Sequence, residues 1–225
     1  MAKAKPFIKW VGGKSQLIEQ LDAQLPADFG NWENVTYIEP FVGGGAMLFY
    51  MLQRYPNIQH AIINDINPDL ATCYRTVRDT PEQLIESLRD IENAYLAIET
   101  EDGRKDFFMA ARERYNEKNL DPIENSTKFF FLNRTCFNGL YRVNKKGFFN
   151  VPFGKYSNPT ICDPETIRKD SELLQRVEIL NSDFEATFEH AHGDTLFYFD
   201  PPYRPLSDTS SFNDYAKEAF NDDAQ

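Results

Sequence analysis

The sequence has no long hydrophobic run, and it has few cysteines. No apolar stretch approaches the roughly 20 residues that a membrane-spanning helix needs. The basic residues near the N-terminus are not followed by an apolar segment, so we expect no secretory signal. The three cysteines, Cys73, Cys136 and Cys162, are odd in number and too far apart for a disulfide framework or a zinc ribbon. We therefore expect a cytoplasmic protein without a membrane segment, built as one large domain or one domain with an insertion.

Acidic residues are absent from two stretches, although the formal net charge of the chain is −11. Residues 1–18 contain only lysines as charged side chains, and residues 126–162 contain lysines and arginines but no acid. Solvated surface charge is the simpler interpretation of any such stretch. In a chain this acidic, however, two acid-free stretches favour a local binding site for a polyanion. The basic residues of the second stretch are Lys128, Arg134, Arg142, Lys145, Lys146 and Lys155.

A phosphate-binding P-loop is incomplete in this sequence. Gly12-Gly13-Lys14-Ser15 matches only the end of that motif, because position 8 is Ile where the motif needs its first glycine. No buried strand precedes the glycines. The sequence therefore argues against an NTPase and predicts only a tight turn at Gly12–Gly13, followed by a helix that begins at Ser15.

Residues 35–65 have the pattern of the first unit of a nucleotide-binding α/β sheet. Residues 35–39 predict a short buried strand, residues 40–45 a glycine turn, and the residues from Ala46 onward a helix. The next strand ends at Asp65, twenty positions after Gly45. An acid at this spacing can accept hydrogen bonds from ribose hydroxyls.

Two details disfavour NAD as the nucleotide. The last glycine of its fingerprint is missing, because position 48 is Leu, and Glu39 stands directly before the turn, where a pyrophosphate would bind. A cation that carries a ribose, such as the sulfonium of S-adenosylmethionine, fits the local charge better. An NAD oxidoreductase is a distant alternative.

The middle of the chain predicts several helices and one strand. Asn67-Pro68 begins one helix, a second follows Pro81, and a third covers residues 167–174. Residues 177–181 predict a strand. His190 and His192 stand two positions apart, so they do not share a helix face, and we expect surface residues and no metal site. The side chains expected in the core are Leu84, Leu88, Ile91, Tyr95, Ile98, Phe107, Phe108 and Tyr115.

The last predicted strand, residues 196–199, ends in Asp200-Pro201-Pro202-Tyr203. Proline cannot donate to a sheet and restricts the residue before it, so pairing should stop at Asp200 and leave a stiff, extended segment. A carboxylate and outward carbonyls beside a flat ring suit a planar amine. A simple turn with a packed tyrosine is the alternative.

Residues 133–156 alternate aromatic and amide side chains with basic ones. Asn138-Gly139 and Lys146-Gly147 are turn signals. Arg and Asn are the side chains that read guanine and adenine edges, Lys contacts phosphates, and rings can fill the space of a displaced base. We therefore favour a nucleic-acid loop. An aromatic core strand with a basic rim is the alternative, and residues 129–132 are expected in the core.

Taken together, these motifs resemble the N6-adenine DNA methyltransferases of the Dam type, most closely the enzymes that modify GATC. The resemblance covers nearly the whole chain. Its motifs are Lys9-Trp10-x-Gly12-Gly13-Lys14, Glu39-Pro40-Phe41-Val42-Gly43-x-Gly45, Asn64-Asp65, residues 138–142 (NGLYR), residues 149–156 (FNVPFGKY), Asp183-Phe184 and residues 200–207 (DPPYRPLS).

The resemblance implies a fold, a cofactor and a partner. The fold would be a doubly wound Rossmann-like methyltransferase sheet with an inserted, mainly helical target-recognition domain. Residues 1–75 and 165–225 would bind S-adenosylmethionine and carry catalysis, and residues 76–164 would recognise double-stranded DNA. The enzyme would be encoded by a bacterium or a phage. Neither a metal nor a covalent intermediate is implied.

The resemblance also implies roles for individual residues. A flipped adenine would stack on Tyr203 while Asp200 and the Pro201 carbonyl hold its N6 amine. The catalytic set is Asp200, Pro201, Pro202 and Tyr203. The cofactor set is Trp10, Lys14, Glu39, Phe41, Gly43, Gly45, Asp65, Asp183, Phe184 and Asp200. The DNA-binding set is Lys9, Arg134, Phe137, Asn138, Leu140, Arg142, Lys145 and Lys155.

Members of this family continue beyond the point where this sequence ends. Without further strands, the strand that carries Asp200 would have an uncovered edge. We therefore expect either a monomer or an association that covers the edge. The alternative function is a non-catalytic fragment that binds DNA or cofactor.

Overall fold

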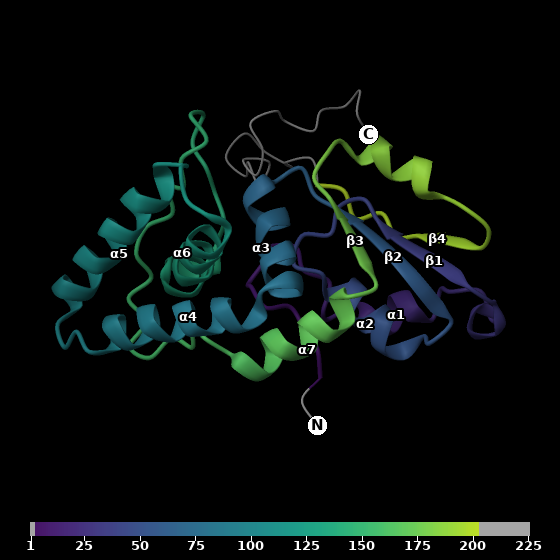
Figure 1. Ribbon diagram of the computed structural model, residues 1–225, viewed down its shortest axis with the longest axis horizontal. Coiled ribbons are helices and arrows are strands. Elements are labelled where there is room, and N and C mark those ends of the chain that lie inside the picture. Colours follow the sequence, from purple (N-terminus) through teal and green to yellow (C-terminus); the bar gives the residue numbers. More distant parts are fainter. Residues whose placement is uncertain (1–2, 203–225) are drawn as a thin grey trace.

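The computed structural model describes residues 3–202, and its centre is a four-stranded parallel sheet (Figure 1). The strands are β1 (Val35–Glu39), β2 (Ile58–Asn64), β3 (Val177–Leu180) and β4 (Thr195–Phe197), in the order β3-β2-β1-β4. In the register, Tyr37 of β1 lies opposite Ala61 of β2 and Leu196 of β4. The strands predicted at 35–39, 61–64 and 177–181 are thus confirmed.

The strand order reverses its direction at β1. From β1 the chain proceeds outward to β2 and β3, and then returns to place β4 on the other side of β1. In a parallel sheet all carboxyl ends meet at one edge, and ligands bind where the order reverses. Glu39 is the last residue of β1, and Asp65 and Asp200 follow β2 and β4 at this edge.

Helices α2 (Ala46–Arg54), α3 (Pro68–Asp79) and α7 (Pro164–Leu174) pack together on one side of the sheet, as Figure 1 shows. The predicted start of α3 is confirmed: the Asn67 side chain accepts hydrogen bonds from the backbone N–H groups of Asp69 and Leu70, and Pro68 occupies the first turn. The η3 turn (Phe184–His190) contacts β2. It lies on the opposite side of the sheet from α7 in Figure 1.

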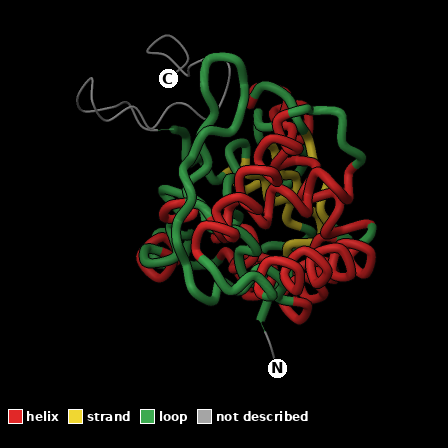
Figure 2. The backbone as a smooth tube through the Cα atoms, turned by 90° about the vertical axis from the view of Figure 1, so that its left-hand side faces the viewer, coloured by secondary structure: helices red, strands yellow, loops and turns green. Residues whose placement is uncertain are grey.

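A second group of helices stands beside α3: α4 (Pro81–Leu96), α5 (Glu101–Asn116) and α6 (Pro122–Thr135). They stand in front of the strands in Figure 2. Their core is aromatic, since the Phe131 ring meets the rings of Tyr95 and Phe107 edge-on at 5.4 and 5.5 Å. The buried stripe of α4 is confirmed for Leu84, Leu88, Ile91 and Tyr95, whereas Ile98 lies beyond the end of the helix and is half-buried.

The structure corrects three local expectations. Residues 129–132 are buried as expected, but they belong to α6 and not to a strand. Asp121 caps this helix and Pro122 begins it, and the four consecutive residues 129–132 are all buried because α3, α4 and α5 pack against α6. The helix expected from Ser15 is the short α1 (Ile18–Asp22). The last strand ends at Phe197, although the Tyr198 N–H still donates to the Ile38 carbonyl at 2.9 Å.

The N-terminal segment joins the two groups of helices. The Ala4 N–H donates to Gln53 Oε1 in α2 at 3.0 Å, and Arg134 of α6 donates to the Phe7 carbonyl at 2.7 Å. Across residues 3–202, no helix could cross a membrane, and no three His, Cys, Asp or Glu side chains are grouped to hold a metal.

Candidate active site

The carboxyl edge of the sheet is held together by Asn64, a buried residue at the end of β2. Its amide nitrogen donates to the carbonyls of Pro40 (3.1 Å) and Ser182 (3.0 Å), and its oxygen accepts from the Ser182 N–H (3.0 Å). These partners follow β1 and β3. One side chain therefore fixes three strand ends relative to one another.

Asp65, the acid that follows β2, holds the glycine turn. Its carboxylate accepts hydrogen bonds from the backbone N–H groups of Gly43 (3.1 Å) and Asn67 (2.9 Å). Burial raises the pKa of Asp65 to about 6, against the lowering effect of these two bonds. The carboxylate is therefore mainly ionised at neutral pH, and it lies between the glycine turn and the start of α3.

Trp10 packs directly on the glycine turn. A Cβ added to Gly43, whose φ is +48°, would lie 2.7 Å from Trp10 Nε1. A Cβ on Gly44 would lie 2.9 Å from the Trp10 Cβ. Both glycines are thus needed because the Trp10 indole approaches the backbone closely. Gly43 is also needed for its left-handed backbone conformation. The structure brings the predicted cofactor residues Trp10, Gly43 and Asp65 together.

Lys14 and Asp200 meet across 186 positions of sequence. The Lys14 ammonium donates to Asp200 Oδ2 at 2.7 Å and to the Gly12 carbonyl at 2.8 Å. Both side chains are largely shielded from solvent. The structure confirms the turn at Gly12–Gly13. This turn places the Lys14 ammonium against the Asp200 carboxylate, which follows β4. Tyr203 lies outside the described residues.

Glu39 is 2% exposed, and its carboxyl group accepts a hydrogen bond from the Tyr37 hydroxyl. Burial raises the pKa of Glu39 to about 8, and the nearby Asp200 adds to the rise, against the hydrogen bond from Tyr37. At neutral pH the group is mainly a neutral acid. Its negative charge, which counted against a pyrophosphate in the sequence, is therefore largely suppressed.

Phe41 and Phe184, both predicted to contact the cofactor, stack on each other. Their ring centroids are 5.4 Å apart and the planes differ by 29°. Asp183 is exposed, and its carboxylate accepts the Glu185 N–H at 3.1 Å to begin η3. The loops after β1 and β3 are thus joined by aromatic contact at the same edge.

The loop after α6 is attached through Asn133, a buried residue that the sequence prediction missed. Its amide nitrogen donates to the carbonyls of Lys9 (2.8 Å) and Gly139 (3.0 Å), and its oxygen accepts the Lys9 N–H (2.8 Å). The Lys9 ammonium lies 4.9 Å from the centre of the Tyr156 ring. An amide among the apolar residues of α6 was the only sequence signal for this role.

Most predicted DNA-binding side chains lie together around residues 137–145 and near Lys9. Phe137 is 51% exposed, and the exposed Asn138 adopts a left-handed φ of +55°. Arg142 is exposed and donates to Asn150 Oδ1 at 2.7 Å. Lys145 is exposed and Leu140 is half-buried.

Two predicted DNA-binding residues are instead engaged within the protein. Arg134 is half-buried, its guanidinium donates to the Phe7 carbonyl at 2.7 Å, and burial lowers its pKa. Lys155 forms an exposed ion pair with Glu101 at 2.6 Å. In this conformation Arg134 fixes the N-terminal segment, and Lys155 joins the loop to α5.

Comparison with known proteins identifies the family. A model of the D12 class N6 adenine-specific DNA methyltransferases matches residues 10–225. The chain is 47% identical to the Type II methyltransferase M.MjaIII of Methanocaldococcus jannaschii, over 99% of this chain and 77% of that protein. It is 36% identical to a DNA adenine methylase of Vibrio cholerae, over 100% of this chain and 74% of the relative. It is 31% identical to the DNA adenine methylase of Escherichia coli K12, over 98% and 72%. The resemblance drawn from the motifs is confirmed, and the chain belongs to the D12 class N6 adenine-specific DNA methyltransferases.

Proposed function

We propose that this protein transfers a methyl group from S-adenosylmethionine to N6 of an adenine flipped out of duplex DNA, within the sequence GATC. The observation that carries the proposal is the meeting of Lys14 and Asp200 at the carboxyl edge of the sheet, the edge at which Asp65 holds the glycine turn. The loop that carries Arg142 is tied to the same N-terminal segment through Asn133 and Lys9. The N-terminal segment therefore contacts both the Asp200 carboxylate, proposed to hold the adenine amine, and the basic loop proposed to bind DNA.

The residues at this edge fit S-adenosylmethionine, the cofactor that the family implies. Asp65 offers a carboxylate for ribose hydroxyls, and the glycine turn allows close approach of a ligand to the backbone. The remaining acids favour a cationic ligand. When bound, the cofactor supplies an electrophilic methyl group. The residues that would hold it are Trp10, Lys14, Glu39, Phe41, Gly43, Gly45, Asp65, Asp183, Phe184 and Asp200.

Asp200 and the Pro201 carbonyl would accept hydrogen bonds from the two N–H groups of the adenine amine. The lone pair of this amine is delocalised into the ring, and two acceptors favour a more tetrahedral nitrogen with a localised lone pair. Catalysis then consists of placement and electrostatics. Lys14 orients Asp200, and Pro202 with Tyr203 would form the surface on which the base stacks.

Recognition of the duplex would fall to the loop after α6. Lys9 and Arg142 would read base edges, Phe137 and Asn138 would enter the space of the flipped base, Lys145 would contact phosphate, and Leu140 would contact DNA from the same loop. Residues 76–164 would then be the recognition domain, inserted into a Rossmann-like catalytic domain of residues 1–75 and 165–225. We place the enzyme in the cytoplasm, where its duplex substrate is found.

Transfer of tritiated methyl groups to duplexes tests this proposal directly. We expect labelling of a duplex with one GATC site, and little labelling of duplexes with one base of the site changed. A GATC duplex whose adenines are already N6-methylated is the matched control and should take up no label. Equal labelling of all sequences would contradict the GATC assignment.

Binding of duplex and cofactor without turnover would instead support a non-catalytic binding fragment. This alternative is supported by apolar side chains near β4 that are exposed in the described part of the chain: Phe188 and Phe199 are each 48% exposed. If copies of the chain associate and cover these rings, sedimentation would show a molecular mass that rises with protein concentration.

A further inference from the structure

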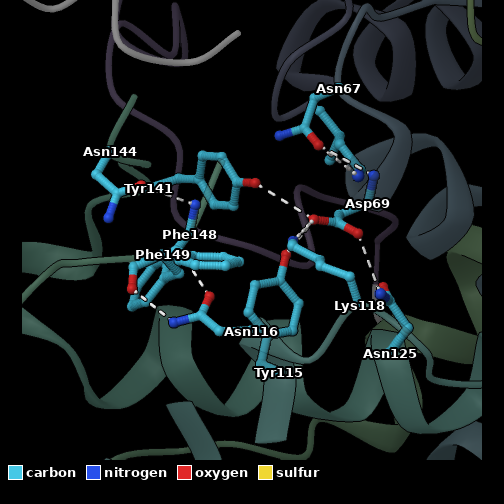
Figure 3. Close-up of polar contacts among 11 residues, drawn as sticks. Asn67, Asp69, Tyr115, Asn116, Lys118, Asn125, Tyr141, Asn144, Phe148 and Phe149 are labelled. Atoms are coloured by element: carbon cyan, nitrogen blue, oxygen red, sulfur yellow. Dashed lines mark hydrogen bonds and ion pairs between the residues drawn. The ribbon is translucent and has the colours of Figure 1, made fainter. Parts of the chain in front are cut away.

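Asp69, in the first turn of α3, receives four hydrogen bonds from the part of the chain that follows α4 (Figure 3). Its side chain is 13% exposed. The donors come from α5 and the residues after it, from α6, and from the DNA-binding loop. They are the Tyr115 hydroxyl (2.5 Å), the Lys118 ammonium (2.7 Å) and the Tyr141 hydroxyl (3.4 Å), all on Oδ2, and the Asn125 amide (3.1 Å) on Oδ1.

This carboxylate is held in its ionised form. Burial by itself would raise the pKa of Asp69, but the Lys118 ammonium and the donors from Tyr115 and Asn125 outweigh burial and lower it. An ionised acceptor strengthens each of its hydrogen bonds. Asp69 therefore holds the first turn of α3 to the group of helices that contains α5 and α6.

On the cofactor side, Asp69 is connected to Asp65 through two short steps. The Asp69 N–H donates to the Asn67 side chain at 3.0 Å, and the Asn67 N–H donates to Asp65 at 2.9 Å. A shift of the first turn of α3 would therefore move the carboxylate proposed to hold the ribose.

On the DNA side, Tyr141 directly precedes the base-reading residue Arg142. Its ring stacks on Trp10 (centroids 5.6 Å apart, planes 24° apart) and on Phe129 (5.2 Å, 28°). Tyr141 thus contacts Trp10 with its ring and Asp69 with its hydroxyl, and both contacts lead to the proposed cofactor residues. The hydrogen bond from the Tyr141 hydroxyl is the longest of the four on Asp69, so we expect it to change length most easily when the loop moves.

We propose that Asp69 and Tyr141 are positioning residues that link cofactor binding to the placement of the base-reading loop. The inference rests on the proposed function, because it needs Asp65 and Trp10 to contact cofactor and Arg142 to contact DNA. Cofactor that fixes Trp10 and the start of α3 also fixes Tyr141, and hence Arg142. By linkage, each ligand then raises the affinity for the other by the same factor.

The test compares two substitutions that each remove one hydrogen bond from the Asp69 carboxylate. Tyr141→Phe keeps the ring that stacks on Trp10. Asn125→Ala is the control, since its amide belongs to α6 and bonds the other carboxylate oxygen. The affinity for S-adenosylhomocysteine is measured by calorimetry with and without the duplex that the wild-type enzyme methylates best. The ratio of the two affinities is the coupling.

We expect Tyr141→Phe to lower this ratio by about fivefold or more, towards one. We expect Asn125→Ala to keep the wild-type ratio while lowering the unfolding temperature, because it loses a shorter bond to Asp69 (3.1 Å against 3.4 Å for Tyr141). An unchanged ratio in Tyr141→Phe would overturn the inference. Equal loss in both variants would also overturn it, since the network would then act only through stability.

The wild-type measurements separate this inference from the proposed function. A wild-type protein that methylates DNA but shows a ratio of one overturns the inference and leaves the function intact. A wild-type protein that neither transfers methyl groups nor binds S-adenosylhomocysteine overturns the proposed function, and the inference with it. Fluorescence of Trp10 in a Trp32→Phe background, the only other tryptophan being replaced, gives a readout of the Trp10–Tyr141 stack that does not depend on turnover.

Discussion

The carboxyl edge of the sheet and the loop after α6 are built in opposite ways. At the sheet edge, the functional groups themselves are fixed: Asp65 is bonded by two backbone N–H groups and Asp200 by Lys14. In the loop, the backbone is fixed, and most side chains proposed to meet DNA are exposed, although Arg142 donates to Asn150 within the loop. Asn133 holds Gly139 of the loop by its carbonyl, and Asn116 holds both the N–H and the carbonyl of Phe149 (Figure 3).

This difference matches the two tasks. Methyl transfer needs charge that is already in place before reaction, because preorganised electrostatics cost no rearrangement at the moment of transfer. Base reading needs donors that meet their partners only when the duplex arrives, on a backbone that sets their register. Substitutions in the two regions should therefore fail differently: at the edge in chemistry and cofactor affinity, in the loop in discrimination between sequences.

The largest effect is expected at Asp200. Asp200→Ala removes the proposed acceptor for the adenine amine, and we expect the rate of methyl transfer to fall by about 1,000-fold or more. Single-turnover labelling measures the rate, and thermal unfolding checks the fold. Asp194→Ala, an exposed acid at the other end of β4, is the matched control and should keep wild-type transfer. Activity near wild type in Asp200→Ala would refute the catalytic role.

The next effect concerns Asp65 and pH. Its pKa in the folded protein is raised to about 6, so the group favours folding less as pH rises from about 4 to 6, and in the folded protein it becomes protonated as pH falls below about 6. If its ionised form binds the ribose, the affinity for S-adenosylhomocysteine should fall about tenfold for each pH unit below 6. Calorimetry at pH 5 and pH 7.5 measures this. Asp65→Asn should bind about 10- to 100-fold more weakly at pH 7.5 and lose most of this dependence; an unchanged slope would contradict the assignment.

The smallest effects separate base reading from phosphate contact in the loop. Arg142→Ala should reduce the discrimination between GATC and a single-base variant by about 5- to 150-fold, the range of a base contact worth 1–3 kcal/mol. Lys145→Ala should weaken binding to both duplexes alike and reduce the salt slope by about one. Fluorescence anisotropy over a range of salt concentrations gives both quantities. A larger loss of discrimination in Lys145→Ala than in Arg142→Ala would exchange the two roles.

The sequence predicts the parts of this site that depend on neighbours along the chain. The β1 strand, the glycine turn, β2 and Asp65 follow from local periodicity and a fixed spacing, and the structure confirms that Gly43 and Asp65 meet. The composition of residues 133–156, with aromatic, amide and basic side chains and no acid, was enough to predict a loop there. In each case the physical cause lies within about 30 residues, which is the length of one strand–helix–strand unit.

Contacts between distant segments could not be predicted from local patterns. Lys14 was expected among the cofactor residues, but its bond to Asp200 depends on how the first turn packs beside the last strand. Arg134 reads as a phosphate ligand until α6 places it against Phe7. The neutral state of Glu39 depends on burial that only the assembled sheet provides. The four donors on Asp69 likewise converge only after α3, α5, α6 and the loop have packed together.

The bond pattern of Asn133 bears on any attempt to exchange recognition loops between members of this family. A single amide joins Lys9, near the start of the chain, to Gly139 in the loop. A loop transplanted without the end of α6 and residues 7–10 would lose this attachment, and its backbone would keep only the hydrogen bonds that Asn116 makes to Phe149 among those described above. If the loop reads DNA as proposed, the unit to transfer is discontinuous in sequence: the N-terminal segment, the last turn of α6, and the loop together.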